Sequence, residues 1–286
     1  MSWRTVVVSN RCKLDTKMGY MVIRGEETKR IFLDEIAMVL IENPAVSLTG
    51  CLLEALNERK IRVIFCDKKR SPYAEIVPYY GSGDCSGKIR RQIAWTALAK
   101  DTVWRQILAN KIQKQADHLA ARKCNREAIL LESYVSQIAY QDQTNREGHA
   151  AKVYFNALFG MGFSRSQNSP INTALNYGYG ILLSAFNREI VANGYLTQLG
   201  IHHDNAQNPY NLSSELMEPF RILVDRETAQ MELTEFSKTE KYKLVNILNH
   251  HVEINGTDQT VLNAIRIYIR SILASLNENG QGLRVV

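Results

Sequence analysis

The chain has 286 residues, 45% of them hydrophobic, and carries a formal net charge of +6. This length and apolar fraction allow one large or two modest packed domains and exclude global disorder. The five cysteines lie far apart and form no CxxC pair, which argues against a zinc ribbon and a disulfide scaffold. The basic excess favours an anionic partner only weakly, since many basic proteins bind no nucleic acid.

The N-terminal stretch lacks the layout of a signal peptide, because its apolar run, Val6–Val8, is far too short. No apolar run approaches the ~20 residues that a membrane helix needs. The sequence also contains no nucleophile elbow, P-loop or dinucleotide-binding fingerprint. We therefore expect a cytoplasmic protein with reduced thiols and no membrane partner.

The first 76 residues are typical of a β-rich domain. Short β-branched runs bounded by Gly, Asn, Asp or Pro predict strands, and leucines at helical spacing predict one helix at residues 49–60. The runs are RTVVVSN (4–10), GYMVIRG (19–25), RIFLD (30–34), IAMVLIEN (36–43) and IRVIFCD (61–67). The prolines, glycines and serines of residues 68–87 indicate a linker or hairpin, and we assign 77–87 to a linker.

From about residue 88 the hydrophobic period becomes helical. The residues near one helical stripe are Ile89, Ile93, Ala97, Trp104, Leu108, Ile112 and Leu119. The rest is predicted to be helices broken by polar turns, with a frayed tail after residue 276. The predicted fold class is therefore α+β, with a small N-terminal β-rich domain (1–76) followed by a larger all-α domain (88–286).

Positive charge is concentrated in residues 88–126, which hold ten Lys or Arg against two acids. A solvated helix face is one explanation. The alternative is a surface whose amines and guanidiniums release counterions from a phosphate backbone. Since nothing in this stretch is typical of base-edge reading, it favours binding directed by backbone or shape. The basic residues are Lys88, Arg90, Arg91, Lys100, Arg105, Lys111, Lys114, Arg122, Lys123 and Arg126.

The stretch TNREGHAAKVYFNALFG (144–160) begins a predicted helix. Thr144 and Glu147 have the spacing of a capping box, in which the glutamate bonds back to the N-cap amide. This structural role does not explain Gly148, which weakens a helix by ~1 kcal/mol relative to Ala. A glycine beside a carboxylate lets another chain or a backbone come close. Glu147 therefore has two open roles, as part of the helix cap or as half of a metal site.

A second candidate stretch covers residues 194–225. His202 and His203 follow a glycine, and SSELMEPFR then begins a helix, with Ser213 or Ser214 as the expected cap. Glu215 and Glu218 are three residues apart, which places them on one helix face. One imidazole with carboxylates makes a mixed N/O donor set that suits Mn²⁺ or Mg²⁺ better than a metal that prefers thiolates.

The stretch between these two motifs predicts another helix, in which Asn172 and Asn176 share one face and Tyr177 and Tyr179 flank Gly178. Two readings stay open. In one, the amides and phenols are satisfied inside a buried helix; in the other, they line the site or contact DNA.

Three segments, in order after a β-rich part, carry a family resemblance: NREGHAAKVYFNALFG (145–160), PINTALNYGYGILLS (170–184) and SSELMEPFRILVD (213–225). Together they resemble the helical domain of the CRISPR-associated spacer-acquisition integrase, of the type II kind. That family has a β domain that mediates dimerisation and a helical domain that holds one divalent metal, Mg²⁺ or Mn²⁺.

By motif, the resemblance implies that Glu147, His203 and Glu218 are the metal ligands and catalytic residues. His203 is preferred to His202 because its distance from ELMEPFR fits the motif better. Arg221 matches a basic position near the DNA phosphate. The residues expected to support the ligands or contact a phosphate are Asn145, Arg146, Asn172, Tyr177, Glu215 and Arg221. Those expected to bind DNA are Arg90, Arg91, Lys111 and Lys114.

The implied reaction joins 3′-hydroxyl ends of short foreign DNA to the repeat edges of a CRISPR array by metal-dependent transesterification. The implied partners are double-stranded DNA, a second copy of the chain and the small second CRISPR adaptation protein. A DNA-end-binding ring protein and the effector nuclease are further expected partners. One alternative is a metal-dependent endonuclease acting on branched or single-stranded DNA. Another is a DNA-binding scaffold without an active site.

Overall fold

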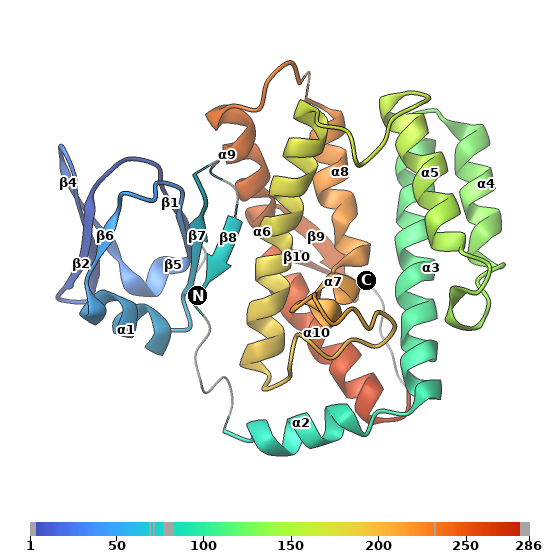
Figure 1. The fold of residues 1–286 in the computed structure, drawn as a ribbon, viewed down its shortest axis with the longest axis horizontal. Coiled ribbons are helices and arrows are strands. Elements are labelled where there is room, and N and C mark those ends of the chain that lie inside the picture. The colour runs from blue at the N-terminus through green and yellow to red at the C-terminus, as the bar shows by residue number, and fades with distance from the viewer. Residues whose placement is uncertain (1–3, 69, 71, 77–82, 232, 281–286) are drawn as a thin grey trace. The chain divides into compact units, whose positions relative to one another are not determined.

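In a computed structural model the chain divides into two units, Met1–Tyr79 and Tyr80–Val286. The structure describes residues 4–68, 70, 72–76, 83–231 and 233–280 (Figure 1). The first unit is β-rich and the second mainly helical, which confirms the predicted α+β class. No helix in these described ranges is long and apolar enough to cross a membrane.

The first unit holds two four-stranded sheets, ordered β1-β5-β7-β8 and β4-β3-β2-β6. In the first sheet β1, β5 and β7 run parallel, and β5 is buried along its whole length, as its unbroken apolar sequence requires. Buried side chains from both sheets and from α1 form one core. The strands are β1 (Arg4–Val8), β2 (Lys13–Lys17), β3 (Tyr20–Arg24), β4 (Thr28–Phe32), β5 (Ile36–Ile41), β6 (Ser47–Leu48), β7 (Arg62–Cys66) and β8 (Pro72–Glu75), with η1 (Leu33–Glu35) and α1 (Gly50–Glu58).

All five predicted strands and the predicted helix are present in this unit. The sequence analysis missed β2, β6 and β8. The sequence KLDTK of β2 is mostly polar, and its partners β3 and β6 come later in the chain. Residues 68–87 were predicted to be a linker or a hairpin. β8 pairs antiparallel with β7, so the hairpin prediction is confirmed for the first part of this stretch.

The second unit is built on two long helices, α3 and α6. In Figure 1, α4 and α5 lie beside α3, while α8, α9 and α10 surround α6. The elements are α2 (Cys85–Ile93), α3 (Ala97–Ala121), α4 (Asn125–Val135), η2 (Tyr140–Asp142), α5 (Arg146–Phe159), α6 (Pro170–Ala192), α7 (Asn211–Leu216), η3 (Glu218–Phe220), α8 (Arg221–Ala229), α9 (Lys238–Asn246), η4 (Ile247–Asn249), β9 (His251–Ile254), β10 (Thr257–Thr260) and α10 (Val261–Asn277).

The predicted apolar stripe over residues 89–119 is split between two helices. The chain leaves the helix after Ile93, and the Thr96 side chain starts α3 by accepting a hydrogen bond from the amide of Ala99. Trp104 and the apolar residues after it are buried, whereas Ile93 is 67% exposed. The stripe is therefore correct for α3 from Trp104 onward, and wrong for α2 and for Ala97, which is exposed at the start of α3.

Two further expectations need correction. Cys85–Gly87, assigned to the linker, form the first turn of α2, while residues 77–82 lie outside the described part. The second unit also contains a hairpin, β9–β10, whose turn residues Asn255 and Gly256 have φ of +53° and +71°. This left-handed pair is the turn that an Asn-Gly dipeptide favours between strands. The tail expected to be frayed begins at Asn277, which is instead the last residue of α10. Residues 281–286 lie outside the described part of the chain.

A glycine sets the distance between α6 and α8. A Cβ placed on Gly178 would lie 2.5 Å from Cγ1 of Val224, which no real packing permits. Only a residue without a side chain lets these two helices approach this closely. This close approach positions Tyr179, from α6, against Asp225, from α8.

We expect Gly178→Ala to lower the free energy of unfolding by about 1–3 kcal/mol, because overpacking outweighs the gain in helix propensity. Val224→Ala in the same chain removes the clashing methyl groups. The double variant should therefore be more stable than the sum of the two single changes predicts. Urea unfolding of the four proteins measures this coupling, and strictly additive effects would contradict the close-packing explanation.

Candidate active site

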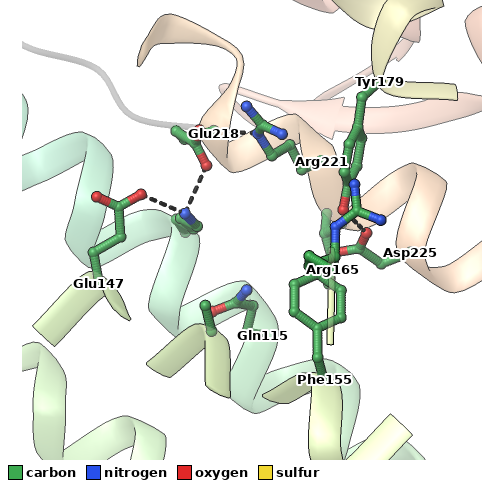
Figure 2. Close-up of a pocket in the computed structure, with 11 residues that line it drawn as sticks. Gln115, Glu147, Phe155, Arg165, Tyr179, Glu218, Arg221 and Asp225 are labelled. Carbon is green, nitrogen blue, oxygen red and sulfur yellow. Dashed lines mark hydrogen bonds and ion pairs between the residues drawn. The ribbon is translucent and has the colours of Figure 1, made fainter. Parts of the chain in front are cut away.

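The second unit contains a cavity of about 240 Å³. Its lining side chains come from α3, α5, α6, η3, α8 and the loop between α5 and α6. Figure 2 shows Glu147 and Glu218 on one side and Tyr179, Arg165 and Asp225 on the other. Charged groups of both signs therefore meet in one partly enclosed space.

Two glutamates from distant parts of the chain share one ammonium group in this cavity. Nζ of Lys111, on α3, lies 2.7 Å from Oε1 of Glu147 and 2.6 Å from Oε2 of Glu218. The side chain of Lys111 is only 11% exposed and that of Glu218 only 9%. Burial alone would lower the pKa of Lys111, but the neighbouring Glu218 and Glu147 raise it above its usual value. Lys111 is therefore a buried cation within the site.

Arg221 supplies a second positive charge to Glu218. Its Nε lies 2.9 Å from Oε1 of Glu218. Burial alone would raise the pKa of Glu218, but Arg221 and Lys111 outweigh burial and hold it below its usual value. Both contacts of Glu218 are close ion pairs. Electrostatic attraction therefore holds the Glu218 carboxylate ionised in the cavity.

The start of α5 differs from the predicted capping box. The N-cap is Asn145, in a left-handed conformation, and its side chain accepts a hydrogen bond from the amide of Gly148. The Asp142 carboxylate accepts from the amides of Arg146 and Glu147. The first turn is thus capped without the Glu147 side chain, which is free to reach Lys111.

The contacts of the helix cap explain why residue 148 is a glycine. A Cβ at this position would lie 2.6 Å from the capping oxygen of Asn145, so the glycine makes room for the cap and not for another chain. Thr144, the predicted cap, instead donates its hydroxyl to the carbonyl of Gln137.

His203 is positioned by a buried carboxylate. Glu215, fully buried, accepts hydrogen bonds from the amides of Ile201, His202 and His203, and lies 3.2 Å from Nδ1 of His203. The bond to Glu215 raises the pKa of His203 above its usual value. Nδ1 is therefore occupied, and Nε2 is the ring nitrogen left for another partner.

The loop that carries His203 is tightly fitted. A Cβ at Gly200 would lie 2.5 Å from the carbonyl oxygen of His203 and 2.9 Å from Oε1 of Glu215, so a glycine is required there. The ring of His202 stacks on Trp104, with centroids 4.7 Å apart and planes 8° apart. Of the two adjacent histidines, His202 is therefore a packing residue.

The helix expected from Ser213 or Ser214 begins earlier, at Asn211, and Ser213 is buried inside it. This helix ends at Leu216, before Glu218, which belongs to the turn η3. Glu215 and Glu218 are thus on separate elements and do not share the face of one helix. Glu215 holds the His203 loop, and Glu218 enters the cavity.

Arg165, which the sequence analysis did not single out, extends from the loop between α5 and α6 into the cavity. Its two terminal nitrogens lie 2.5 Å from Oδ1 of Asn172 and 2.6 Å from Oδ1 of Asn176. Both asparagines of the predicted polar face therefore hold one guanidinium. The only sequence signal for Arg165 is a cation within a short Gly- and Ser-containing loop.

A buried phenol and carboxyl group form the opposite wall. The hydroxyl of Tyr179 donates to Asp225, and burial raises the pKa of Asp225 to about 6. The guanidinium carbons of Arg221 and Arg165 lie 4.7 Å and 5.3 Å from the centre of the Tyr179 ring. Tyr179 was predicted only in the open alternative in which the phenols line a site, and Asp225 was not among the predicted site residues.

Several predicted residues lie away from the cavity lining. Tyr177 packs edge-on against Phe236, with ring centroids 5.4 Å apart, so Tyr179 and not its neighbour faces the cavity. Arg146 lies over the ring of Tyr134. The Lys114 amine lies over the ring of Phe220, and burial lowers its pKa to about 8.

The two predicted DNA-binding arginines of α2 are on the surface. Arg90 and Arg91 are exposed, and Arg91 forms an ion pair of 2.9 Å with Asp84. Lys111, predicted together with them, is instead the buried cation between the two glutamates.

The carboxylate oxygens and imidazole nitrogen of the site are the types of donor atom that a hard divalent cation binds. Two carboxylates already converge on one cation, and an imidazole with an available Nε2 is held on the adjacent loop. Within the described ranges, no three His, Cys, Asp or Glu side chains are gathered as a metal site. Two of the three predicted ligands therefore converge, and the third, His203, remains bonded to Glu215.

Comparison with known protein families places these features in context. The chain matches the family described as CRISPR associated protein Cas1 over residues 5–246. It is 30% identical over 284 residues to the CRISPR-associated endonuclease Cas1 of Neisseria meningitidis serogroup C (strain 8013), covering 97% of this chain and 93% of that protein. A relative from Francisella tularensis subsp. novicida (strain U112), similarly named, is 25% identical over 287 residues, covering 91% and 89%.

Solved structures share the fold at 18% sequence identity. A casposase bound to an integration product superposes with a TM-score of 0.81, covering 99% of this chain and 92% of that one. A Cas1 protein from Thermotoga maritima gives a TM-score of 0.77, with 96% and 97% covered. A Cas6-RT-Cas1–Cas2 complex gives 0.76, with 99% of this chain and 36% of that one covered.

His118, buried on α3, predicts a pH dependence of stability. Its Nδ1 lies 2.8 Å from the hydroxyl of Tyr154, and burial, with Arg226 and Arg122 nearby, lowers its pKa to about 4. The unfolded state binds this proton below about pH 6.5, so the histidine should destabilise the fold by roughly 2–3 kcal/mol as pH falls to 4. His118→Gln should remove this loss, which urea unfolding at pH 6.5 and 4.5 measures.

Asp225 changes the free energy of unfolding in the opposite direction. Its raised pKa makes the folded state bind a proton more tightly than the unfolded state between about pH 4 and 6, so it stabilises the fold as the pH falls. The difference between wild type and His118→Gln, not the wild-type curve, therefore isolates the histidine. An identical pH dependence in both proteins would show that His118 is protonated in the fold as readily as in the unfolded chain.

Proposed function

The chain belongs to the Cas1 family of CRISPR-associated proteins, and we propose that it is a divalent-metal-dependent DNA integrase of CRISPR adaptation. It joins 3′-hydroxyl ends of short foreign DNA to the repeat edges of a CRISPR array. The observation that carries this proposal is the convergence of Glu147 and Glu218 on a single cation inside a cavity. Burying two carboxylates from distant segments costs desolvation free energy. A function that needs their negative charge explains why both are present in the cavity.

Glu147, Glu218 and His203 are the residues that would hold the metal, either Mg²⁺ or Mn²⁺. When bound, the metal polarises the attacked phosphate and favours the ionised form of the 3′-hydroxyl. Glu215 keeps Nδ1 of His203 occupied, so that Nε2 is the nitrogen left to bind the metal. Arg221 places a guanidinium beside Glu218, where it counters the charge of a phosphodiester.

Lys111 balances the two glutamates within the protein itself. Its ammonium group lies within 2.7 Å of both carboxylates and offsets their mutual repulsion. This contact replaces the proposed role of Lys111 on an open DNA-binding face. Arg90, Arg91 and Lys114 remain proposed contacts to the phosphate backbone of duplex DNA.

The partners follow from the same proposal. Joining both ends of one DNA fragment needs two active sites at a fixed separation, which a single chain does not supply. We propose a homodimer formed through residues 1–76, with residues 88–286 as the catalytic domain. A structural neighbour is a complex that contains Cas1 and Cas2, and Cas2 is the small second adaptation protein proposed as partner here. A DNA-end-binding ring protein and the effector nuclease are the further proposed partners.

A second candidate function is a metal-dependent endonuclease on branched or single-stranded DNA. The names of the relatives from Neisseria meningitidis and Francisella tularensis, both CRISPR-associated endonucleases, favour it. The same residues then direct water instead of a 3′-hydroxyl at the phosphodiester. The two functions differ in product, since an integrase yields a joined strand and an endonuclease yields only fragments.

We expect Glu147→Gln, Glu218→Gln and His203→Ala each to reduce strand transfer at least 100-fold. The assay combines the protein, Cas2, Mn²⁺, a labelled duplex with 3′-hydroxyl ends and a plasmid carrying the matching repeat array. Each variant should also bind Mn²⁺ more weakly by calorimetry, because each lacks one proposed donor. Glu127→Gln, a change of the same kind on α4 outside the cavity, is the control and should leave both measurements unchanged.

Label joined to the plasmid by wild type alone would support the integrase and its ligands together. Fragments without joined product would favour the endonuclease. Joining that survives the three changes would reject the proposed ligands, provided that circular dichroism shows the variants to be folded.

Lys111→Met tests the internal cation. The change leaves two carboxylates in the cavity without their shared partner, so we expect a loss of about 3–5 kcal/mol in the free energy of unfolding without metal. Saturating Mn²⁺ should raise the melting temperature of this variant more than that of wild type, because no ammonium group competes for the carboxylates. Lys114→Met, one turn further along α3, is the matched control. Equal Mn²⁺ shifts in all three proteins would contradict metal binding at this position.

A further inference from the structure

The guanidinium of Arg165 is held by neutral side chains. In the part of the chain that the structure describes, Lys111 and Arg221 form ion pairs with glutamates, whereas Arg165 bonds to the neutral amides of Asn172 and Asn176. The Arg165 side chain is half-buried and lines the same cavity. Its position is thus determined by hydrogen bonds that leave its charge intact.

The amide of Asn172 is oriented by its own network. Its Nδ2 donates to the carbonyl oxygens of Ser164 and Gln167, at 2.8 Å each, which uses both amide hydrogens. Its Oδ1 must therefore face Arg165. The loop, the start of α6 and the guanidinium form one hydrogen-bonded unit, and Asn172 is itself buried. Such prior orientation lowers the entropic cost of binding a ligand.

The remaining donors of Arg165 suit a phosphate. A guanidinium has five N–H groups in a planar fork, and the two asparagine bonds use two of them. The others are available for the charge-assisted, paired hydrogen bonds that phosphate oxygens accept. The Tyr179 ring, which contacts the guanidiniums of both Arg165 and Arg221, holds these two cations in one cavity.

We propose that Arg165, positioned by Asn172 and Asn176, binds a DNA phosphate next to the phosphodiester that reacts at Glu147 and Glu218. This inference rests on the proposed function and adds a second phosphate position to it. A polynucleotide strand carries one phosphate per nucleotide, so a strand that reacts on one side of the cavity presents a neighbouring phosphate to the other side. Arg165 contacts substrate through its charge and fixes the path of the strand.

The test measures equilibrium binding, which does not depend on catalysis. The probe is a branched duplex that mimics the joined product, prepared with one neutral methylphosphonate at each position around the branch. For wild type, one substituted position should weaken binding about 10-fold. For Arg165→Gln, binding of unmodified DNA should weaken about 10-fold, and the salt slope should fall by about one. At that one position, the neutral linkage should then cause no further loss.

Two matched variants separate charge from shape. Asn176→Asp places a carboxylate on Arg165 without removing the guanidinium, and should weaken binding as Arg165→Gln does. Arg270→Gln removes an equal charge from an exposed position on α10 and should leave the methylphosphonate pattern unchanged. If Arg165→Gln and the neutral linkages weaken binding additively at every position, Arg165 contacts no phosphate and the proposal is wrong.

The strand-transfer assay on the same proteins keeps the two proposals apart. If one neutral linkage weakens binding to wild type but not to Arg165→Gln, and no joined product forms, the result would support the phosphate site and reject the integrase. Joined product from wild type and Arg165→Gln at equal rates, with additive binding losses, would support the integrase and reject the phosphate site.

Discussion

The structure of the site depends on one buried electrostatic interaction, in which the ammonium group of Lys111 forms ion pairs with both Glu147 and Glu218. Each carboxylate alone would oppose folding, because burial removes its hydration. The shared cation, with Arg221 on the far oxygen of Glu218, brings the group to two positive and two negative charges. α3, the first turn of α5 and the turn η3 are therefore held together by electrostatic attraction as well as by apolar packing.

Around this charged centre, hydrogen bonds and close packing fix the geometry. Asn145 and Asp142 cap α5 so that Glu147 need not, and Glu215 binds three consecutive amides of the His203 loop. Gly178 lets α6 and α8 approach until Tyr179 reaches Asp225. Each functional side chain thus has a separate residue that orients it. Substitution of a supporting residue is expected to alter the site without removing any group that contacts DNA.

The sequence predicted the elements and the ligand-bearing motifs where the signal was local or carried by a family motif. β-branched runs located five strands, and the three motif segments led to Glu147, His203 and Glu218. It did not predict the partners of Lys111, because contacts between distant segments leave no trace in local spacing. It also missed Arg165, whose partners Asn172 and Asn176 are near in sequence but are brought to it by the loop before α6. The Asn255–Gly256 turn was a local signal that was overlooked within an otherwise helical pattern. The Thr144 cap was wrong because Asn145 and Asp142, both strong capping residues, compete for the same amides.

The cavity has a consequence for how such a chain can diverge. Every described side chain that lines it comes from residues 111–225, within the second unit. The described residues of the β-rich unit contribute no side chain to it. Under the proposed function, substitutions on the surface of the first unit can change its contacts with other proteins while every side chain of the cavity stays the same. The two units of the chain can therefore diverge at different rates during evolution.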